Sequence, residues 1–122
     1  MTMPHLCATF ERLLIYHGGY DVFARLLTLG VHPLTIAFPW LRYGFESYLD
    51  PEQLLLLWDR VVAYGDIGVG LLPVLAVAVF AFRSKQISDA RTLREAKEAL
   101  EDGSCLRVIP LLQGFLFPEA FR

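Results

Sequence analysis

The sequence predicts an all-α protein, and two observations support this prediction. Leucine occurs 22 times against 14 for valine and isoleucine together, although strands favour the β-branched residues. No strict alternation of apolar and polar residues runs for six positions, whereas apolar residues recur at helical spacing along most of the chain. We therefore expect a multi-helix array of about six to seven helices.

The first three helices follow from apolar stripes and from their glycine and proline boundaries. A helix over residues 5–16 stops at two glycines, and a shorter helix over 22–29 ends at Gly30, which suits the left-handed C-cap conformation. Pro33 fits the first turn of the third helix, and we expect Pro39 to kink this helix rather than end it. Its apolar stripe continues for four turns through Leu34, Phe38, Leu41, Phe45 and Tyr48.

The fourth helix, over residues 51–63, has a clear start signal. Asp50 reads as the N-cap, Pro51 as the first helical residue, and Gln53 as the third residue of a capping box. We expect one side to bury Leu54, Trp58, Val61 and Val62, and the other to expose Glu52, Gln53, Asp59 and Arg60. Leu56 falls among the polar residues and packs on a second layer or marks a partner surface. Single exposed leucines are common in proteins, so we favour a structural role for Leu56 over a partner surface.

The stretch from residue 67 to 82 has no charged residue. It is either a core helix of a globular protein or the anchor of a membrane protein. Pro73 and the preceding glycines shorten the helix to about residues 71–82, and twelve residues are too few to span a bilayer. We favour a buried central helix, with a membrane anchor over 67–82 as the alternative.

The C-terminal third is strongly charged before it becomes apolar again. Between residues 83 and 107, 11 of 25 residues are charged, and a surface helix is expected over about 90–101. A last apolar segment follows over 104–118, and we expect Pro110 to break it. No linker divides the chain, so we predict a single domain over 1–122.

The reactive residues give no sign of a catalytic, metal or cofactor site. Cys7 and Cys105 lie 98 positions apart, which indicates neither a zinc pair nor a disulfide framework but a reducing compartment. The histidines His5, His17 and His32 make no i, i+4 pair, and nucleotide-binding and hydrolase motifs are absent. Hydrophobic residues make up 55% of the chain, which excludes disorder. The chain has 11 basic and 13 acidic residues, and this balance argues against a nucleic-acid partner, which would require a basic surface.

An ordered set of residues resembles the C-terminal half of a TBC domain, the GTPase-activating domain for Rab proteins. The matching strings are Leu29-Gly30-Val31, Pro33, Phe38-Pro39-Trp40-Leu41, Phe45, Leu54-Leu55-x-Leu57-Trp58-Asp59 and Tyr64-Gly65-Asp66. The resemblance covers about residues 10–101, so the 1–122 domain is a partial one. We expect the signature residues to be core and turn residues rather than catalysts: Gly30, Pro33, Trp40, Leu57, Trp58 and Asp59. A buried Asp59 would accept hydrogen bonds from the backbone or from an indole.

The resemblance also implies partners and a location. It implies a Rab GTPase partner, a role in vesicle trafficking, and a cytoplasmic protein that meets endomembranes only peripherally, through its partner. The missing N-terminal half of the domain, or another protein, would cover apolar surface that these helices expose.

The family's activity depends on an arginine finger in an I-x-x-D-x-x-R motif and a glutamine in a Y-x-Q motif, both in the N-terminal half. Neither motif occurs in this chain. An arginine finger is worth about 10³–10⁵ in rate, so we expect the chain alone neither to be a hydrolase nor to accelerate GTP hydrolysis.

Three hypotheses follow. The first is a piece of a TBC-type activator that supplies core helices and part of the GTPase-binding surface without the fingers. The second is a non-catalytic helical module that binds a small GTPase or an adaptor. The third is a small protein anchored in a membrane through residues 67–82.

Overall fold

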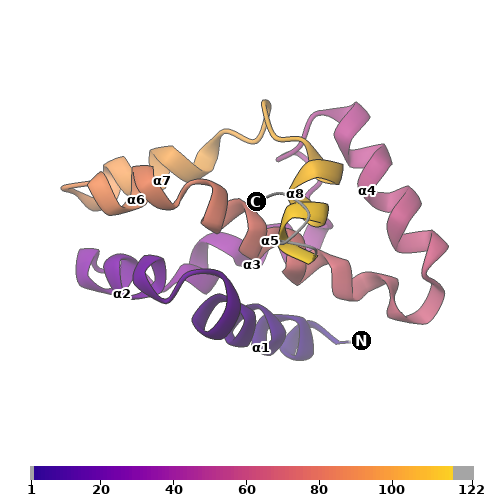
Figure 1. Cartoon of the computed structure of the whole chain (residues 1–122), viewed down its shortest axis with the longest axis horizontal. Helices are drawn as coiled ribbons and strands as arrows, with labels where there is room; N and C mark the ends of the chain where they lie inside the picture. The colour runs from indigo at the N-terminus through magenta and orange to yellow at the C-terminus, as the bar shows by residue number, and fades with distance from the viewer. Residues whose placement is uncertain (1, 117–122) are drawn as a thin grey trace.

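The computed structural model describes residues 2–116, and its regular structure is helical, which confirms the all-α prediction (Figure 1). In chain order the elements are α1 (Met3–Leu13), the π-helical turn η1 (Leu14–Gly18), α2 (Tyr20–Leu29), α3 (Pro33–Tyr43), α4 (Pro51–Ala63), the 3-10 helix η2 (Gly65–Gly70), α5 (Leu71–Phe82), α6 (Ser84–Asp89), α7 (Leu93–Glu101) and α8 (Val108–Leu116). These eight α-helices exceed the expected six to seven, because the charged stretch after α5 begins with the short helix α6.

Helix α5 is the centre of the fold. It packs against α1, α3 and α8, and Leu75 through Phe80 are all buried. In Figure 1, α4 lies at one end of the molecule and α2, α6 and α7 lie at the other. A helix that is apolar all round requires neighbours on every side, and α5 has them. The buried central helix predicted over 71–82 is therefore confirmed, with the same bounds.

One continuous helical stretch in the described part of the chain, Gly65–Phe82, is long and apolar enough to cross a membrane. Helices α2 and α3 together meet the same criterion only if they are counted as one span, and they are bent by 112° relative to each other. Half of the Gly65–Phe82 stretch is buried inside the fold, and core helices commonly meet such a criterion. Protein neighbours therefore surround most of the apolar side chains of α5.

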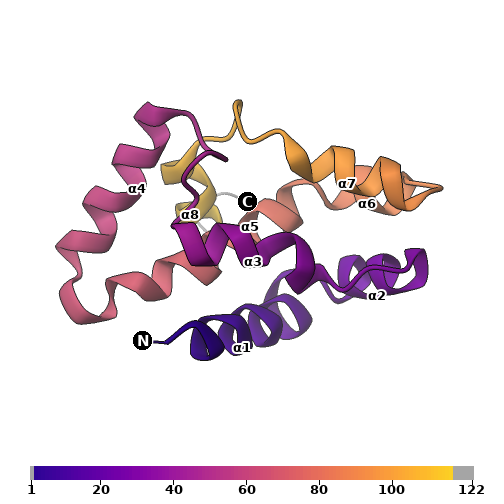
Figure 2. The ribbon, with the colours of Figure 1, turned by 180° about the vertical axis from the view of Figure 1, so that it is seen from behind.

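An aromatic cluster joins α1, α3 and α5. The ring of Phe80 lies 5.4 Å from that of Phe10 and 5.6 Å from that of Trp40. Trp40 also stacks on Tyr48, with 4.5 Å between ring centroids. Aromatic pairs of this kind contribute about 0.5–1.5 kcal/mol each beyond their burial. The cluster holds α3 against the central helix, and Figure 2 shows the ribbon of α3 passing in front of α5.

Helix α3 is shorter than predicted, and its buried face matches the predicted stripe only in part. It continues through Pro39, as expected, but it ends at Tyr43 with Gly44 as a left-handed C-cap at φ 60°. The buried residues are Pro33, Ala37, Trp40 and Leu41, whereas Phe38 is exposed. The predicted stripe was correct for Leu41 and Phe45, which are buried, and for Leu34 and Tyr48, which pack partly buried against the core. It was wrong for Phe38, because α3 is apolar on two sides and its periodicity alone does not show that Ala37 and Trp40 face the core instead.

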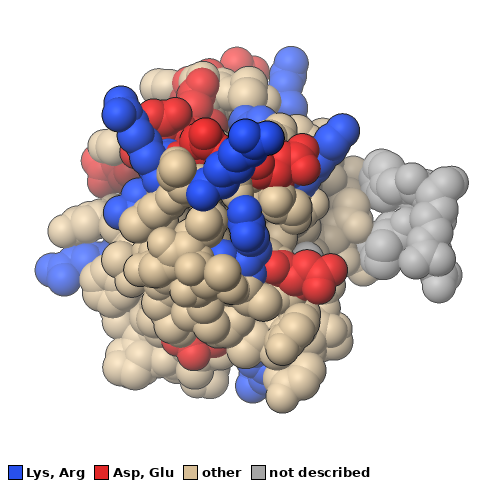
Figure 3. All heavy atoms as spheres, turned by 90° about the vertical axis from the view of Figure 1, so that its left-hand side faces the viewer, with Lys and Arg blue, Asp and Glu red and all other residues tan. Residues whose placement is uncertain are grey.

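The charged helix α7 begins three residues later than predicted. The Thr92 hydroxyl accepts a hydrogen bond from the Glu95 N–H at 3.2 Å, and the Glu95 carboxylate accepts one from the Arg91 N–H at 2.8 Å. These bonds satisfy backbone donors at the start of the helix. Figure 3 shows side chains of both charges gathered over one part of the face at the α2, α6 and α7 end. Mixed charges of this kind form a solvated surface.

The last helix runs from Val108 to Leu116, and Pro110 does not break it. Pro110 is the third residue of α8, where the missing N–H is one of the donors that a helix leaves unpaired in any case. The expectation of a break was therefore wrong. The predicted apolar segment 104–118 extends beyond this helix, and its residues 117 and 118 lie outside the described residues.

Candidate functional site: the outer face of helix α4

The segment between α3 and α4 fixes the position of α4. Phe45 and Ser47 adopt the left-handed conformation at φ 65° and 67°, which costs about 1–2 kcal/mol for a residue with a side chain. Burial of the Phe45 ring and a hydrogen bond from the Tyr48 hydroxyl to the Leu100 carbonyl, at 2.7 Å, hold this segment in place. Burial raises the pKa of Tyr48 to about 12, so the phenol remains a neutral donor.

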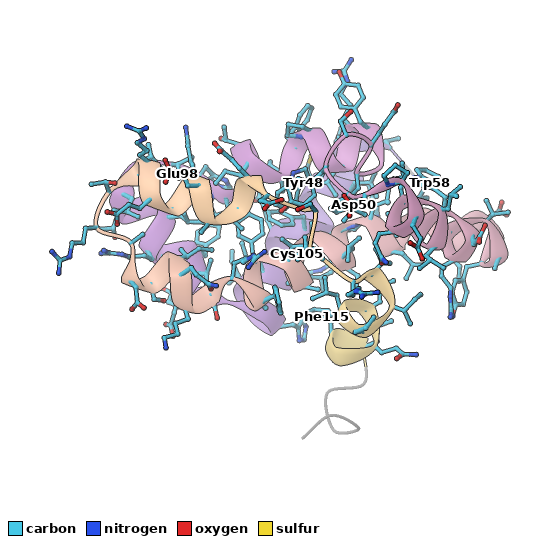
Figure 4. All side chains as sticks on the ribbon, turned by 90° about the horizontal axis from the view of Figure 1, so that it is seen from above. Tyr48, Asp50, Trp58, Glu98, Cys105 and Phe115 are labelled. Atoms are coloured by element: carbon cyan, nitrogen blue, oxygen red, sulfur yellow. The ribbon has the colours of Figure 1, made fainter. Side chains whose placement is uncertain are left out.

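Trp58 of α4, labelled in Figure 4, packs directly on Gly44 at the end of α3. The indole Nε1 donates a hydrogen bond to the Gly44 carbonyl oxygen at 3.0 Å. A Cβ atom on Gly44 would lie only 2.2 Å from Cζ2 of the indole. Glycine is therefore required at position 44 both for its positive φ and for the approach of the ring.

We expect Gly44→Ala to destabilise the chain by about 2–3 kcal/mol, because it adds a clash with the ring to the strain of the left-handed backbone. The clash is limited because Trp58 is partly exposed and its ring can move outward. Urea unfolding followed by circular dichroism measures the change. Gly30→Ala is the matched control, since Gly30 also has a positive φ, of 101°, but has open space around it. Equal costs for the two variants would show that the Trp58 contact is unimportant.

The inner face of α4 contains a buried polar residue that the sequence analysis placed outside. Gln53, Leu57 and Val61 are buried, and Gln53 Oε1 accepts a hydrogen bond from the backbone N–H of Val108 at 2.9 Å. Val108 is the first residue of α8, so Gln53 caps α8 rather than its own helix. The predicted capping box was wrong because α8 packs on this side of α4 and offers Gln53 a buried donor.

We expect Gln53→Leu to lower the free energy of unfolding by about 1–3 kcal/mol, because it leaves the Val108 N–H buried without an acceptor. The adjacent Glu52 is exposed, so Glu52→Leu serves as the control and should change stability by less than about 0.5 kcal/mol. Denaturant titrations of both variants measure the difference. A neutral Gln53→Leu would mean that the hydrogen bond contributes nothing.

The outer face of α4 is apolar and exposed. We define it by Leu55, Trp58 and Val62, whose side chains are 67%, 36% and 74% exposed. Their spacing of i, i+3 and i+7 places them in one stripe. Glu52 and Asp59 are exposed along one side of it.

Val62 was predicted to be buried, and this prediction was wrong. Helix α4 has apolar side chains on two sides, and the rest of the described chain covers only the inner one. The i, i+7 spacing of Leu55 and Val62 was the signal for a second apolar face. Leu56, which the sequence analysis singled out, is 37% exposed.

The signature residues divide between the interior and this face. Gly30 is the left-handed C-cap of α2, and Pro33 is the buried first residue of α3. Trp40 and Leu57 are buried in the core, Trp58 lies at the edge of the outer face, and Asp59 is exposed beside it. Because Asp59 is exposed, it does not take the buried role considered for it, and the Trp58 indole donates to Gly44 instead.

The described residues offer little catalytic chemistry. No group of three or more His, Cys, Asp and Glu side chains within residues 2–116 is placed to hold a metal ion. A hollow of about 80 Å³ between α4, α5 and α8 has Arg60 as its one charged lining residue. Drug-sized ligands need roughly 300 Å³ or more, so this hollow is too small for one. The larger hollows of the described residues, of about 340–540 Å³, are open to solvent. The outer face of α4 is the stronger candidate site.

Comparison with known proteins supplies the family. No family model matches the chain, and no solved structure matches it. Human TBC1 domain family member 19 is 45% identical to the chain over 112 residues, which is 92% of the chain. The chain spans 21% of the length of that relative. Identity at this level over nearly the whole chain confirms the resemblance seen in the sequence: the chain matches a helical segment of a TBC-domain family member.

Proposed function

We propose that the chain supplies core helices of a TBC-type Rab GTPase-activating domain and part of its GTPase-binding surface, without the catalytic fingers. The 45% identity to a TBC1 domain family member across 92% of the chain is the observation that carries this proposal. The chain lacks both finger motifs in its sequence. It therefore contributes to the structure of the domain and to binding of the GTPase.

The packing of the signature residues supports such a role. Trp40 and Leu57 lie in the core, and Gly30 and Pro33 set the end of α2 and the start of α3. Acceleration of GTP hydrolysis requires a cation at the developing transition-state charge and a group that orients the attacking water. We assign neither role to a residue of this chain.

The test is a GTP hydrolysis assay with a panel of purified Rab proteins, with and without the chain. We expect no stimulation, against the roughly 10³–10⁵-fold effect of an arginine finger. A complete TBC-domain activator serves as the positive control for each responsive Rab. Robust stimulation by the chain alone would contradict the finger-less assignment.

The uncovered outer face of α4 favours a second candidate, a non-catalytic module that binds a small GTPase or an adaptor. Leu55 and Val62 are largely exposed, and neighbouring apolar side chains that are exposed together mark a surface for a protein partner. Coprecipitation with Rabs loaded with GDP or with a GTP analogue tests this candidate. Binding in one nucleotide state supports it, and the absence of binding to every Rab counts against it.

We also propose a cytoplasmic protein that reaches endomembranes only through its partner. Most of the apolar surface of α5 already has protein neighbours. Alkaline carbonate extraction should release the chain into the soluble fraction, and retention in the membrane pellet would favour an anchor over residues 67–82.

A further inference from the structure

Helix α4 has two apolar faces, and the described chain covers only one of them. The inner face packs against α8, while the outer face stays open. Leu55 and Val62 lie seven residues apart, which places their side chains about 10 Å apart along the helix. This distance is two helical turns, the repeat by which one helix packs lengthwise against another.

We propose that the outer face of α4 docks an amphipathic helix from the remainder of the TBC-family domain, and that this helix carries Lys or Arg beside its apolar row. The inference rests on the proposed function and assigns the surface at which the two parts of the domain meet. The chain spans 21% of its human relative, so most of that protein lies outside the matched segment.

Charge identifies the chemistry of the docked helix. Glu52 and Asp59 are seven residues apart, so they form an acidic row alongside the row of Leu55 and Val62. Neither carboxylate takes part in an ion pair within residues 2–116. A basic row on the incoming helix would lie opposite these carboxylates, and complementary charge fixes register and selects the partner.

The same acidic row disfavours two other occupants. Two copies of the chain that met through this face in an antiparallel symmetric dimer would bring the acidic row of each against a like-charged neighbour, which costs affinity. An anionic membrane surface would repel Glu52 and Asp59, since such surfaces attract basic segments. A basic, amphipathic protein helix satisfies both the apolar and the acidic rows.

The experiment uses the whole 122-residue chain coexpressed with the remainder of human TBC1 domain family member 19 outside the matched segment. Complex formation is measured by copurification and by size-exclusion chromatography with light scattering, which also reports self-association. Two double variants, Leu55→Ser with Val62→Ser and Glu52→Lys with Asp59→Lys, should each weaken the complex about tenfold or more.

Matched controls separate the outer face from general effects. Leu27→Ser alters an exposed leucine on α2, and Asp89→Lys with Glu101→Lys makes the same change in net charge at other exposed sites. Both should leave the complex intact, and circular dichroism confirms that every variant folds. Absence of a complex with the unmodified chain, equal losses in the controls, or self-association that Leu55→Ser with Val62→Ser abolishes would each overturn the proposal.

The outcome is separable from that of the proposed function. Formation of the complex tests where the two parts meet, whereas Rab binding and GTP hydrolysis by the purified complex test what the assembled domain does. A complex that depends on the outer face but neither binds nor stimulates any Rab would support the docking surface and contradict the proposed function.

Discussion

Phe80→Ala should destabilise the chain by about 3–5 kcal/mol, the range for removal of a large aromatic side chain from a packed core. Phe80 is fully buried in α5, and its ring contacts those of Phe10 and Trp40. The substitution removes the centre of this cluster and leaves a cavity that the rigid helices around it fill only partly. Since small domains are stable by roughly 5–15 kcal/mol, the variant should lose a large part of its stability.

Phe82→Ala is the matched control, two residues along the same helix. Phe82 is 56% exposed, so its removal should cost less than about 1 kcal/mol. Chemical denaturation of both variants gives the comparison. The result also bears on the membrane alternative, because a lipid-embedded α5 would place both rings in apolar surroundings. Similar effects of the two substitutions would contradict the packed core described above.

Gly68→Ala should destabilise the chain by about 3 kcal/mol or more, through a clash between backbone segments. A Cβ atom at position 68 would lie 1.8 Å from the carbonyl oxygen of Val61 and 2.7 Å from its carbonyl carbon. Neither atom can move without disturbing the last turn of α4. The cost exceeds that of ordinary overpacking, in which flexible side chains move aside.

Gly114→Ala separates this clash from the general effect of replacing glycine. Gly114 lies within α8, and a Cβ atom there would meet nothing within 4 Å. Alanine should therefore stabilise α8 by about 0.5–1 kcal/mol, since glycine is unfavourable inside a helix. Thermal unfolding of the two variants should move in opposite directions. A tolerated Gly68→Ala would show that η2 does not pack on α4 as closely as described.

The features that could be predicted from the sequence are those that local interactions determine. Gly30 ends α2 because the left-handed C-cap is a property of the helix end itself. The bounds of α5 follow from an uncharged run between glycines and an arginine. The order of the family signature was equally visible, because it requires only spacing along the chain.

The features that could not be predicted depend on where distant segments pack. Gln53 looks like a solvent-exposed capping residue until α8, 55 positions later, brings it a backbone donor. Val62 looks like a core residue, and its i, i+7 spacing from Leu55 signals a second apolar face without showing that the described chain leaves this face uncovered. The candidate site was missed for the same reason. An apolar face without a partner has the same periodicity as one with a partner.

The contacts of the segment between α3 and α4 have a consequence for the folding of the chain. Tyr48 bonds to Leu100, Leu49 pairs with Gly103, and Gln53 in the first turn of α4 bonds to Val108, so three positions within six residues reach partners about fifty residues away. Each of these contacts is entropically costly when it forms alone, because it closes a loop of about fifty residues for a single interaction. Once the first has formed, the others close much shorter loops. The two segments should therefore become ordered together, as one cooperative unit that a newly made chain cannot complete until α8 has been synthesised.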